Sequence, residues 1–232
     1  MTVPPTLLAV AHGSRDPAAA AVATDLLGRV RARRPDLDVR LAYLDHAQPT
    51  LADAVGALSG PAVVVPLLLG DAFHSRVDVP AALAGARHHV VQADVLGPDD
   101  LLLDALSVRL AEAGVATGDP GTAVVLAAAG SSRAEAVDEV RALAVRWRAS
   151  GWADVVAAFG SAAQPDVRTA VARLRGSGAP RVAVATYLLF PGRFATEAAA
   201  QGADVTAGPL GAAPEVVELV LRRYQAAQDR PR

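Results

Sequence analysis

The sequence predicts a doubly wound α/β fold built from two similar domains, and three observations predict it. Short apolar, β-branched segments alternate with longer segments of helical periodicity, which is the βαβα pattern of a parallel sheet. The strand segments are apolar almost throughout, as in residues 63–69, and parallel strands covered by helices on both faces need that composition. The two halves of the chain also repeat the same short motifs in the same order.

In the first half, strands are expected over residues 6–11, 38–44, 62–69 and 89–95, and helices over residues 17–34, 49–58, 80–86 and 99–113. Asp16 can cap the first helix, and Pro17 occupies its first position, where a missing N–H costs nothing. Val22, Leu26 and Val30 repeat every four residues and form one stripe toward the sheet. A mostly parallel, four-stranded sheet flanked by helices follows for this half.

The second half restarts the same pattern after a turn-rich segment at residues 114–121. Its motifs follow those of the first half at nearly constant offsets. The motif at residues 12–14, HGS, is echoed by AGS at residues 129–131, and Leu96-Gly97 is echoed by Leu210-Gly211. We therefore expect a duplication, with an N-terminal domain at residues 1–115 that carries the active site and a degenerate C-terminal domain at residues 121–232.

Composition excludes several classes of protein. The chain has 232 residues, of which 52% are hydrophobic and 20% charged, so it can bury a core and is neither disordered nor collagen-like. A formal net charge of -2 makes nucleic acid an unexpected partner. With no cysteine, any metal must bind histidine, carboxylate or water. The apolar runs are too short for a membrane helix and no signal peptide is recognisable, so a cytoplasmic protein is expected.

Two histidines are expected at the same edge of the first sheet. In a sheet of order 2-1-3-4 the first and third strands are neighbours, and ligands bind in the crevice at their carboxyl ends. His12 directly follows the first strand, and His74 lies in the loop after the third. Adjacent strands lie about 4.8 Å apart, so the two imidazoles can face one cavity. This convergence is the main functional prediction of the sequence.

The other histidines are expected to be mainly structural. His88 and His89 open the fourth strand and should point to opposite faces. His46 follows the second strand, whose end also approaches the crevice, but a structural role is favoured for it as well. Asp45 beside it fits a carboxylate ligand or proton acceptor and equally well a solvated residue at the end of a strand.

Arginines near the histidines favour an anionic ligand. Arg15 and Arg76 lie on the loops that carry His12 and His74, and guanidinium groups bind carboxylate or phosphate in bidentate fashion. In the second half the counterparts of the two histidines are Ala129 and Arg193, so that half lacks both imidazoles. It is either a structural partner domain or one wall of a cleft.

Four segments resemble a known family. Residues 12–17 read HGSRDP; residues 43–51 read YLDHAQPTL; residues 66–74 read PLLLGDAFH; and DVP follows at residues 78–80. In this order they resemble the motifs of class II tetrapyrrole chelatases, the sirohydrochlorin chelatases of the CbiX and SirB type. The second half, with YLLFPG at residues 187–192, is similar to the degenerate C-terminal domain of the long, two-domain members.

The resemblance implies a cytoplasmic lyase that inserts Fe(II) or Co(II), with Ni(II) as a further candidate, into sirohydrochlorin for siroheme or cobalamin synthesis. It implies catalytic roles for His12 and His74, with Asp45 as a third metal ligand, and no organic cofactor. The family usually carries Glu at the position of Asp45, and the shorter Asp side chain reaches less far. Ser14, Arg15, Arg76 and Arg193 are expected to bind the substrate carboxylates. A monomer or weak homo-oligomer is expected.

Imidazole suits this reaction, because neutral imidazole both accepts protons near neutral pH and binds Fe(II) and Co(II). Two alternatives stay open. A metal or tetrapyrrole delivery protein would use the same crevice without turnover. A histidine phosphatase also carries His-Gly after its first strand, but it normally has Arg before the histidine, where this chain has Ala11.

Overall fold

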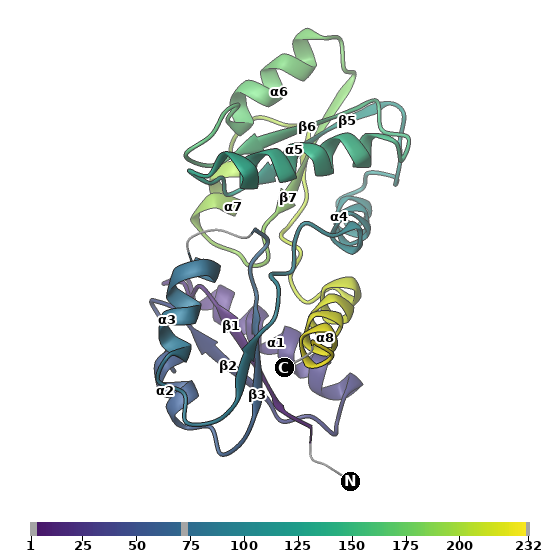
Figure 1. The fold of residues 1–232 in the computed structure, drawn as a ribbon. Helices are drawn as coiled ribbons and strands as arrows, with labels where there is room; N and C mark the ends of the chain where they lie inside the picture. The colour runs from purple at the N-terminus through teal and green to yellow at the C-terminus, as the bar shows by residue number, and fades with distance from the viewer. Residues whose placement is uncertain (1–3, 71–73, 231–232) are drawn as a thin grey trace. The chain divides into compact units, whose positions relative to one another are not determined.

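A computed structural model describes residues 4–70 and 74–230 of the chain, with only the backbone of residues 74 and 75. The chain forms two compact units, one of Met1–Gly97 with Ala212–Arg232 and one of Pro98–Gly211 (Figure 1). Each unit contains a four-stranded parallel sheet with helices, as the sequence predicted. Within the described residues, no helix is long and apolar enough to cross a membrane.

The first unit contains the strands β1 (Thr6–Ala11), β2 (Val39–Tyr43), β3 (Ala62–Pro66) and β4 (Val90–Gln92), the helices α1 (Pro17–Arg33), α2 (Leu51–Gly56), α3 (Val79–Leu83) and α8 (Pro214–Gln228), and a π-helical turn, η1 (His74–Asp78). The cap expected for α1 is present, because the Asp16 carboxylate accepts the backbone N–H of Ala18 at 2.9 Å. Helix α2 begins later than expected, since Thr50 caps it by accepting the N–H of Asp53.

The second unit contains the strands β5 (Thr122–Ala128), β6 (Asp154–Phe159), β7 (Arg181–Tyr187) and β8 (Val205–Thr206) and the helices α4 (Asp100–Glu112), α5 (Ala134–Arg148), α6 (Val167–Gly176) and α7 (Arg193–Ala199). The edge strands β4 and β8 are short, and β4 pairs with β3 only over residues 90–92 rather than along the whole segment 89–95.

The strand orders confirm the predicted topology. The first sheet has the order β2-β1-β3-β4 and the second the order β6-β5-β7-β8, and every pair is parallel. The registers also correspond: Ala11 pairs with Tyr43 in the first sheet, as Ala128 pairs with Phe159 in the second. The central strands β1 and β5 therefore end beside their neighbours on both sides. The residues that follow β1 and β5 lie at the switch point of each sheet.

Each sheet buries one face under a pair of helices that follow its second and third strands. In the first unit Leu8, Val10 and Val64 pack with Leu51 of α2 and Val79 of α3. In the second unit the corresponding cluster joins strands β5, β6 and β7 to α6 and to Ala198 of α7. These close-packed apolar cores fix the strands relative to one another, and this positions the loops at their carboxyl ends.

The last helices of the two sequence repeats are exchanged between the units. Helix α4 packs on β7, and α8 packs on α1, β3 and β4 (Figure 1). The units therefore differ from the expected boundaries, residues 1–115 and 121–232. Periodicity tells which face a helix buries, here with Leu102, Leu106 and Leu110, but it does not tell which sheet covers that face.

Two equivalent arginines hold the exchanged helices. Arg109 of α4 donates to the carbonyl oxygen of Leu210 through Nε at 3.2 Å and Nη2 at 3.0 Å. Arg223 of α8 donates to the carbonyl oxygens of Val95 at 2.8 Å and Leu96 at 2.9 Å. Leu96 and Leu210 are the repeated Leu-Gly motif of the sequence, so each repeat provides an arginine for the strand-end loop of the other.

Candidate active site

The ends of β1 and β2 bring His12 beside Asp45 and His46. The pairing of the two strands continues for two residues beyond their ends, because Leu44 donates its N–H to the carbonyl oxygen of Ala11 at 3.0 Å and Asp45 donates to that of His12 at 2.8 Å. Three side chains with possible chemistry therefore lie at the carboxyl edge of the first sheet. This edge is where a doubly wound sheet binds its ligands.

Gly13 makes this close approach possible. Its φ is 94°, and a Cβ atom added there would lie only 1.7 Å from the carbonyl oxygen of Asp45. No side chain fits at that distance, and L-residues rarely adopt that φ. The glycine of the HGS motif is therefore required by the packing of the turn against the loop after β2.

His46 and His12 face each other at this edge. Their ring centroids lie 6.1 Å apart with an interplanar angle of 47°. The backbone of His46 is left-handed, with a φ of 61°, a conformation in which histidine, asparagine and aspartate are enriched. The structure thus assigns His46 to the candidate site, although the sequence favoured a structural role. The sequence signal for it was its place after the second strand, whose end approaches the crevice.

Each of the two imidazoles has an oxygen acceptor at Nδ1. The Nδ1 atom of His12 lies 3.2 Å from the carbonyl oxygen of Gly13, and that of His46 lies 3.4 Å from Oδ1 of Asp45. The same Oδ1 accepts the backbone N–H of His46 at 2.7 Å. Asp45 is therefore at the predicted site, but one of its oxygens already serves the residue beside it.

His74 stands at the start of the π-helical turn η1, which follows β3. Its side chain lies outside the described residues, so the convergence of His12 and His74 stays a prediction. Among the residues that the structure describes, no group of three or more histidine, aspartate or glutamate side chains could hold a metal ion. The described part of this edge offers two imidazoles and one carboxylate.

The predicted substrate-binding residues of the first unit surround this edge. Ser14 accepts the backbone N–H of Asp16 through Oγ at 3.0 Å, so it helps to shape the turn before α1. Arg15 lies on this turn and is exposed. Arg76 lies in η1 and is also exposed. Both arginines are accessible to an anionic ligand at the surface.

The equivalent edge of the second unit has the same backbone without imidazoles. Gly130 has a φ of 93°, and its added Cβ would lie 2.0 Å from the carbonyl oxygen of Ser161. Ala162 is left-handed like His46, with a φ of 56°, and both loops contain a cis Gln-Pro bond. Ala129 replaces His12 and Ser161 replaces Asp45, so the duplication expected from the sequence extends to backbone detail.

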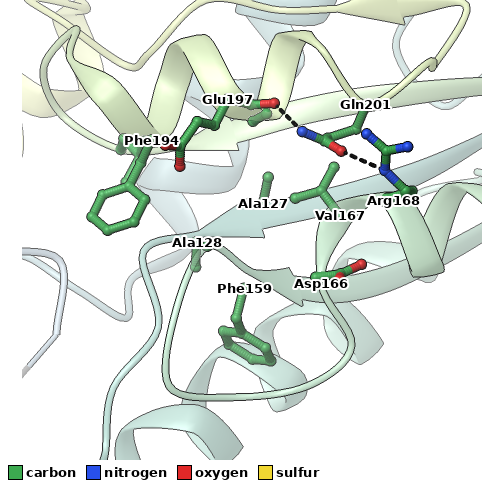
Figure 2. A pocket seen from close by; sticks show the side chains of 12 residues that line it. Ala127, Ala128, Phe159, Asp166, Val167, Arg168, Phe194, Glu197 and Gln201 are labelled. Atoms are coloured by element: carbon green, nitrogen blue, oxygen red, sulfur yellow. Dashed lines mark hydrogen bonds between the residues drawn. The ribbon is translucent and has the colours of Figure 1, made fainter.

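A pocket of about 170 Å³ lies in the second unit, below this edge (Figure 2). Ala127 and Ala128 form part of its wall, and Phe159 and Phe194 line it. It exists because Gly160 leaves room, since a Cβ there would lie 2.7 Å from the Phe194 ring. In the first unit Leu44 occupies the equivalent position and packs against the core.

Polar residues that line this pocket form hydrogen bonds with one another. Arg168 donates to Oε1 of Gln201 at 3.1 Å, and Gln201 donates to the carbonyl oxygen of Glu197 at 2.6 Å, as Figure 2 shows. Asp166 accepts the N–H of Thr169 at 2.7 Å and caps α6, which holds the pKa of Asp166 below its usual range. Among the described residues, the lining of this pocket includes the carboxylates of Asp166 and Glu197 but no imidazole.

Arg193 begins α7 and lies beside this pocket. Its guanidinium carbon is 5.2 Å from the centroid of the Phe194 ring, and Nε is 3.3 Å from Oε1 of Glu197. The side chain is 77% exposed, so these contacts leave it accessible to solvent. The predicted role of Arg193 in substrate binding stays a prediction.

Comparison with known proteins identifies relatives over the whole chain. The CbiX family model matches residues 6–113 and 123–227, which are the two sequence repeats. A sirohydrochlorin cobaltochelatase of Methanosarcina barkeri is 29% identical over 123 residues, covering 46% of this chain and 95% of its own length. A sirohydrochlorin cobaltochelatase of Priestia megaterium is 27% identical over 203 residues, covering 81% of this chain and 65% of its own length.

Solved structures show the same fold. The structure of SirB from Bacillus subtilis with Fe3+ superposes with a TM-score of 0.78 and 22% sequence identity, over 97% of this chain and 96% of that one. The structure of a CbiX from denitrifying bacteria, described as the terminal enzyme of siroheme biosynthesis, has a TM-score of 0.67 and 26% identity, over 96% of this chain and 99% of that one.

Proposed function

The chain belongs to the CbiX family, and from this premise we propose that it inserts a divalent metal ion, Fe(II) or Co(II), into sirohydrochlorin. The observation that carries the proposal is the place of His12. It directly follows the central strand of the first sheet, at the switch point, with its Nδ1 atom facing a backbone carbonyl. Two relatives that match most of the chain are named for cobalt and for iron insertion.

Metallation replaces two protons by one ion. The two pyrrole N–H bonds of the macrocycle break, the four ring nitrogens bind the ion, and two protons leave. A carbonyl oxygen can only accept a hydrogen bond, so the contact with Gly13 places the proton of His12 on Nδ1 and the lone pair on Nε2. Nε2 of His12 can therefore take a proton from the macrocycle or hold the incoming ion.

We assign the remaining predicted residues as follows. His74 supplies a second imidazole from η1, and Asp45 supplies negative charge beside the ion. Ser14, Arg15 and Arg76 on the loops of the first unit bind the peripheral carboxylates of sirohydrochlorin. Arg193 of the second unit is also assigned to substrate binding. Guanidinium groups suit that task, because they bind carboxylates through two parallel hydrogen bonds.

An anaerobic absorbance assay tests the proposal. Purified protein is mixed with sirohydrochlorin and with Fe(II), Co(II) or Ni(II) in turn, and the spontaneous rate is subtracted. We expect the spectrum of the metal-free macrocycle to disappear faster with wild type, and the acceleration to be lost in His74→Ala. His88→Ala serves as the matched control, because His88 is an exposed histidine of the same unit away from this edge.

Two outcomes would overturn the proposal. A spectral shift on binding without turnover would indicate a metal or tetrapyrrole delivery protein. No binding of sirohydrochlorin at all would show that the substrate is wrong. The ranking of the three metals in the same assay determines the preferred ion, since imidazole and carboxylate accept all three.

A further inference from the structure

His46 is placed to handle the metal ion together with His12. The two rings come from loops that follow neighbouring strands, and their centroids are 6.1 Å apart. Imidazole nitrogens bind such divalent ions at about 2.1 Å, so two rings at this separation can meet on one ion. The side chain of His46 is 35% exposed, which leaves it accessible to an ion arriving from solvent.

Both rings have the partner that metal-binding histidines usually have. Such a histidine places its second ring nitrogen against a carboxylate or a backbone carbonyl, which fixes the tautomer and the ring orientation. His12 has the carbonyl oxygen of Gly13 at its Nδ1, and His46 has the carboxylate of Asp45 at its Nδ1. The carbonyl oxygen at Nδ1 of His12 places the lone pair of that ring on Nε2, and the carboxylate near Nδ1 of His46 favours the same tautomer there.

The carboxylate of Asp45 contacts both the backbone and the side chain of His46. Its Oδ1 accepts the backbone N–H of His46 at 2.7 Å and lies 3.4 Å from the Nδ1 atom of the same residue. One carboxylate oxygen thus binds the backbone N–H of His46 and lies near its ring. His46 has a left-handed φ of 61°, and its ring centroid lies 6.1 Å from that of His12.

We propose that His46 is a ligand of the transferred metal ion: Nε2 of His46 and Nε2 of His12 take the divalent ion together, and Asp45 is a positioning residue that orients His46. The inference rests on the proposed function and adds a residue and a role to it. Within the described residues no third such side chain completes a metal centre. Together with the imidazole proposed for His74, these neutral ligands bind the ion weakly enough that it can leave for the macrocycle.

Cobalt alone provides the test. Co(II) is titrated into wild type, His46→Asn, Asp45→Asn and the control His88→Ala. Proton NMR monitors binding through the hyperfine-shifted, exchangeable N–H signals of the imidazoles that bind the ion. Asn is chosen because it also adopts the left-handed backbone. We expect His46→Asn to bind Co(II) at least about tenfold more weakly and to show one shifted N–H signal fewer, and Asp45→Asn to lose about tenfold in affinity. The control should behave like wild type.

Unchanged cobalt affinity and an unchanged number of shifted signals in His46→Asn would overturn the inference. A purely structural His46 would lower the thermal midpoint and leave the signal count as in wild type, which also overturns it. The assay needs no macrocycle, so it separates the two proposals: wild type that metallates sirohydrochlorin while His46→Asn binds cobalt normally refutes only the role of His46. If His46→Asn loses a shifted N–H signal but wild type does not metallate sirohydrochlorin, only the proposed chelatase activity is refuted.

Discussion

The carboxyl edges of the two sheets share a backbone and differ in chemistry. In both, a glycine with φ near 90° passes under a carbonyl oxygen of the neighbouring loop, and a left-handed residue and a cis Gln-Pro bond follow. The first edge carries His12, Asp45 and His46, and the second carries Ala129, Ser161 and Ala162 at the same positions. The same loop geometry therefore exists with and without groups that can bind a metal or accept a proton.

This difference separates what packing requires from what the reaction requires. The glycines are needed in both units because no Cβ atom fits at 1.7 or 2.0 Å from an oxygen. The histidines are not needed for the loop, since alanine occupies both positions in the second unit, and Ala162 has a φ of 56° where His46 has 61°. This difference supports the proposed roles of His12 and His46 in the reaction.

The largest effect is expected for His12. His12→Ala should lower the rate of metal insertion by about 100-fold or more, because the proton acceptor at the switch point is lost. Ser131→Ala, in the corresponding motif of the second unit, should leave the rate unchanged. Initial rates from the absorbance of sirohydrochlorin measure both variants. Equal rates in His12→Ala and wild type would refute the assignment.

The second prediction compares the stability of variants at Gly13 and Gly130, the glycines of the two sheet edges. Gly13→Ala and Gly130→Ala should each lower the free energy of unfolding by about 2 kcal/mol, because alanine at these φ values is strained and its Cβ displaces a carbonyl. Urea unfolding measures both. Only Gly13→Ala should also lower the metallation rate of the folded fraction. A similar loss of rate in Gly130→Ala would contradict the division of roles.

Smaller and equal losses of stability are expected at the arginines of the exchanged helices, Arg109 of α4 and Arg223 of α8. Arg109→Met and Arg223→Met should each lower the free energy of unfolding by about 1 to 2 kcal/mol, because each removes two hydrogen bonds from a guanidinium to a carbonyl oxygen. Urea unfolding again provides the measurement. An effect in one variant alone would show that the two contacts are not equivalent.

The smallest effect concerns acid stability. The N–H of Thr169 lowers the pKa of Asp166, so Asp166 contributes stability above its unfolded pKa, and this contribution is lost as the pH falls through the lower, folded value. The equivalent cap in the first unit is Thr50, which does not titrate. Asp166→Thr should therefore reduce the loss of stability below about pH 4, measured by thermal unfolding across pH. A steeper loss in the variant would contradict the sign.

Much of the fold follows from local pattern. The strand Thr6–Ala11 and the start of α1 at Pro17 agree with the prediction, because a continuous apolar run and an Asp-Pro cap act within a few residues. The strand order 2-1-3-4 was taken from the doubly wound fold class, and the structure has it. The exchange of α4 and α8 was not predicted, since the apolar faces of both helices fit either sheet and only tertiary packing decides between them.

The candidate site could be predicted only in part. His12 and Asp45 were expected from their place after strands β1 and β2. His46 was not, because its orientation depends on a left-handed φ and on the Asp45 carboxylate, and neither has a pattern in the sequence. The pocket in the second unit was also missed, since it depends on the contact between Gly160 and Phe194, which lie far apart in the chain.

The number of cobalt ions bound per chain tests the central claim most directly, because the account places metal chemistry at one sheet edge and not at its copy. Equilibrium dialysis against Co(II) should find one ion per chain in wild type and in His88→Ala, and none in His12→Ala at the same free concentration. Two ions per chain in wild type, or one ion retained in His12→Ala, would contradict the claim.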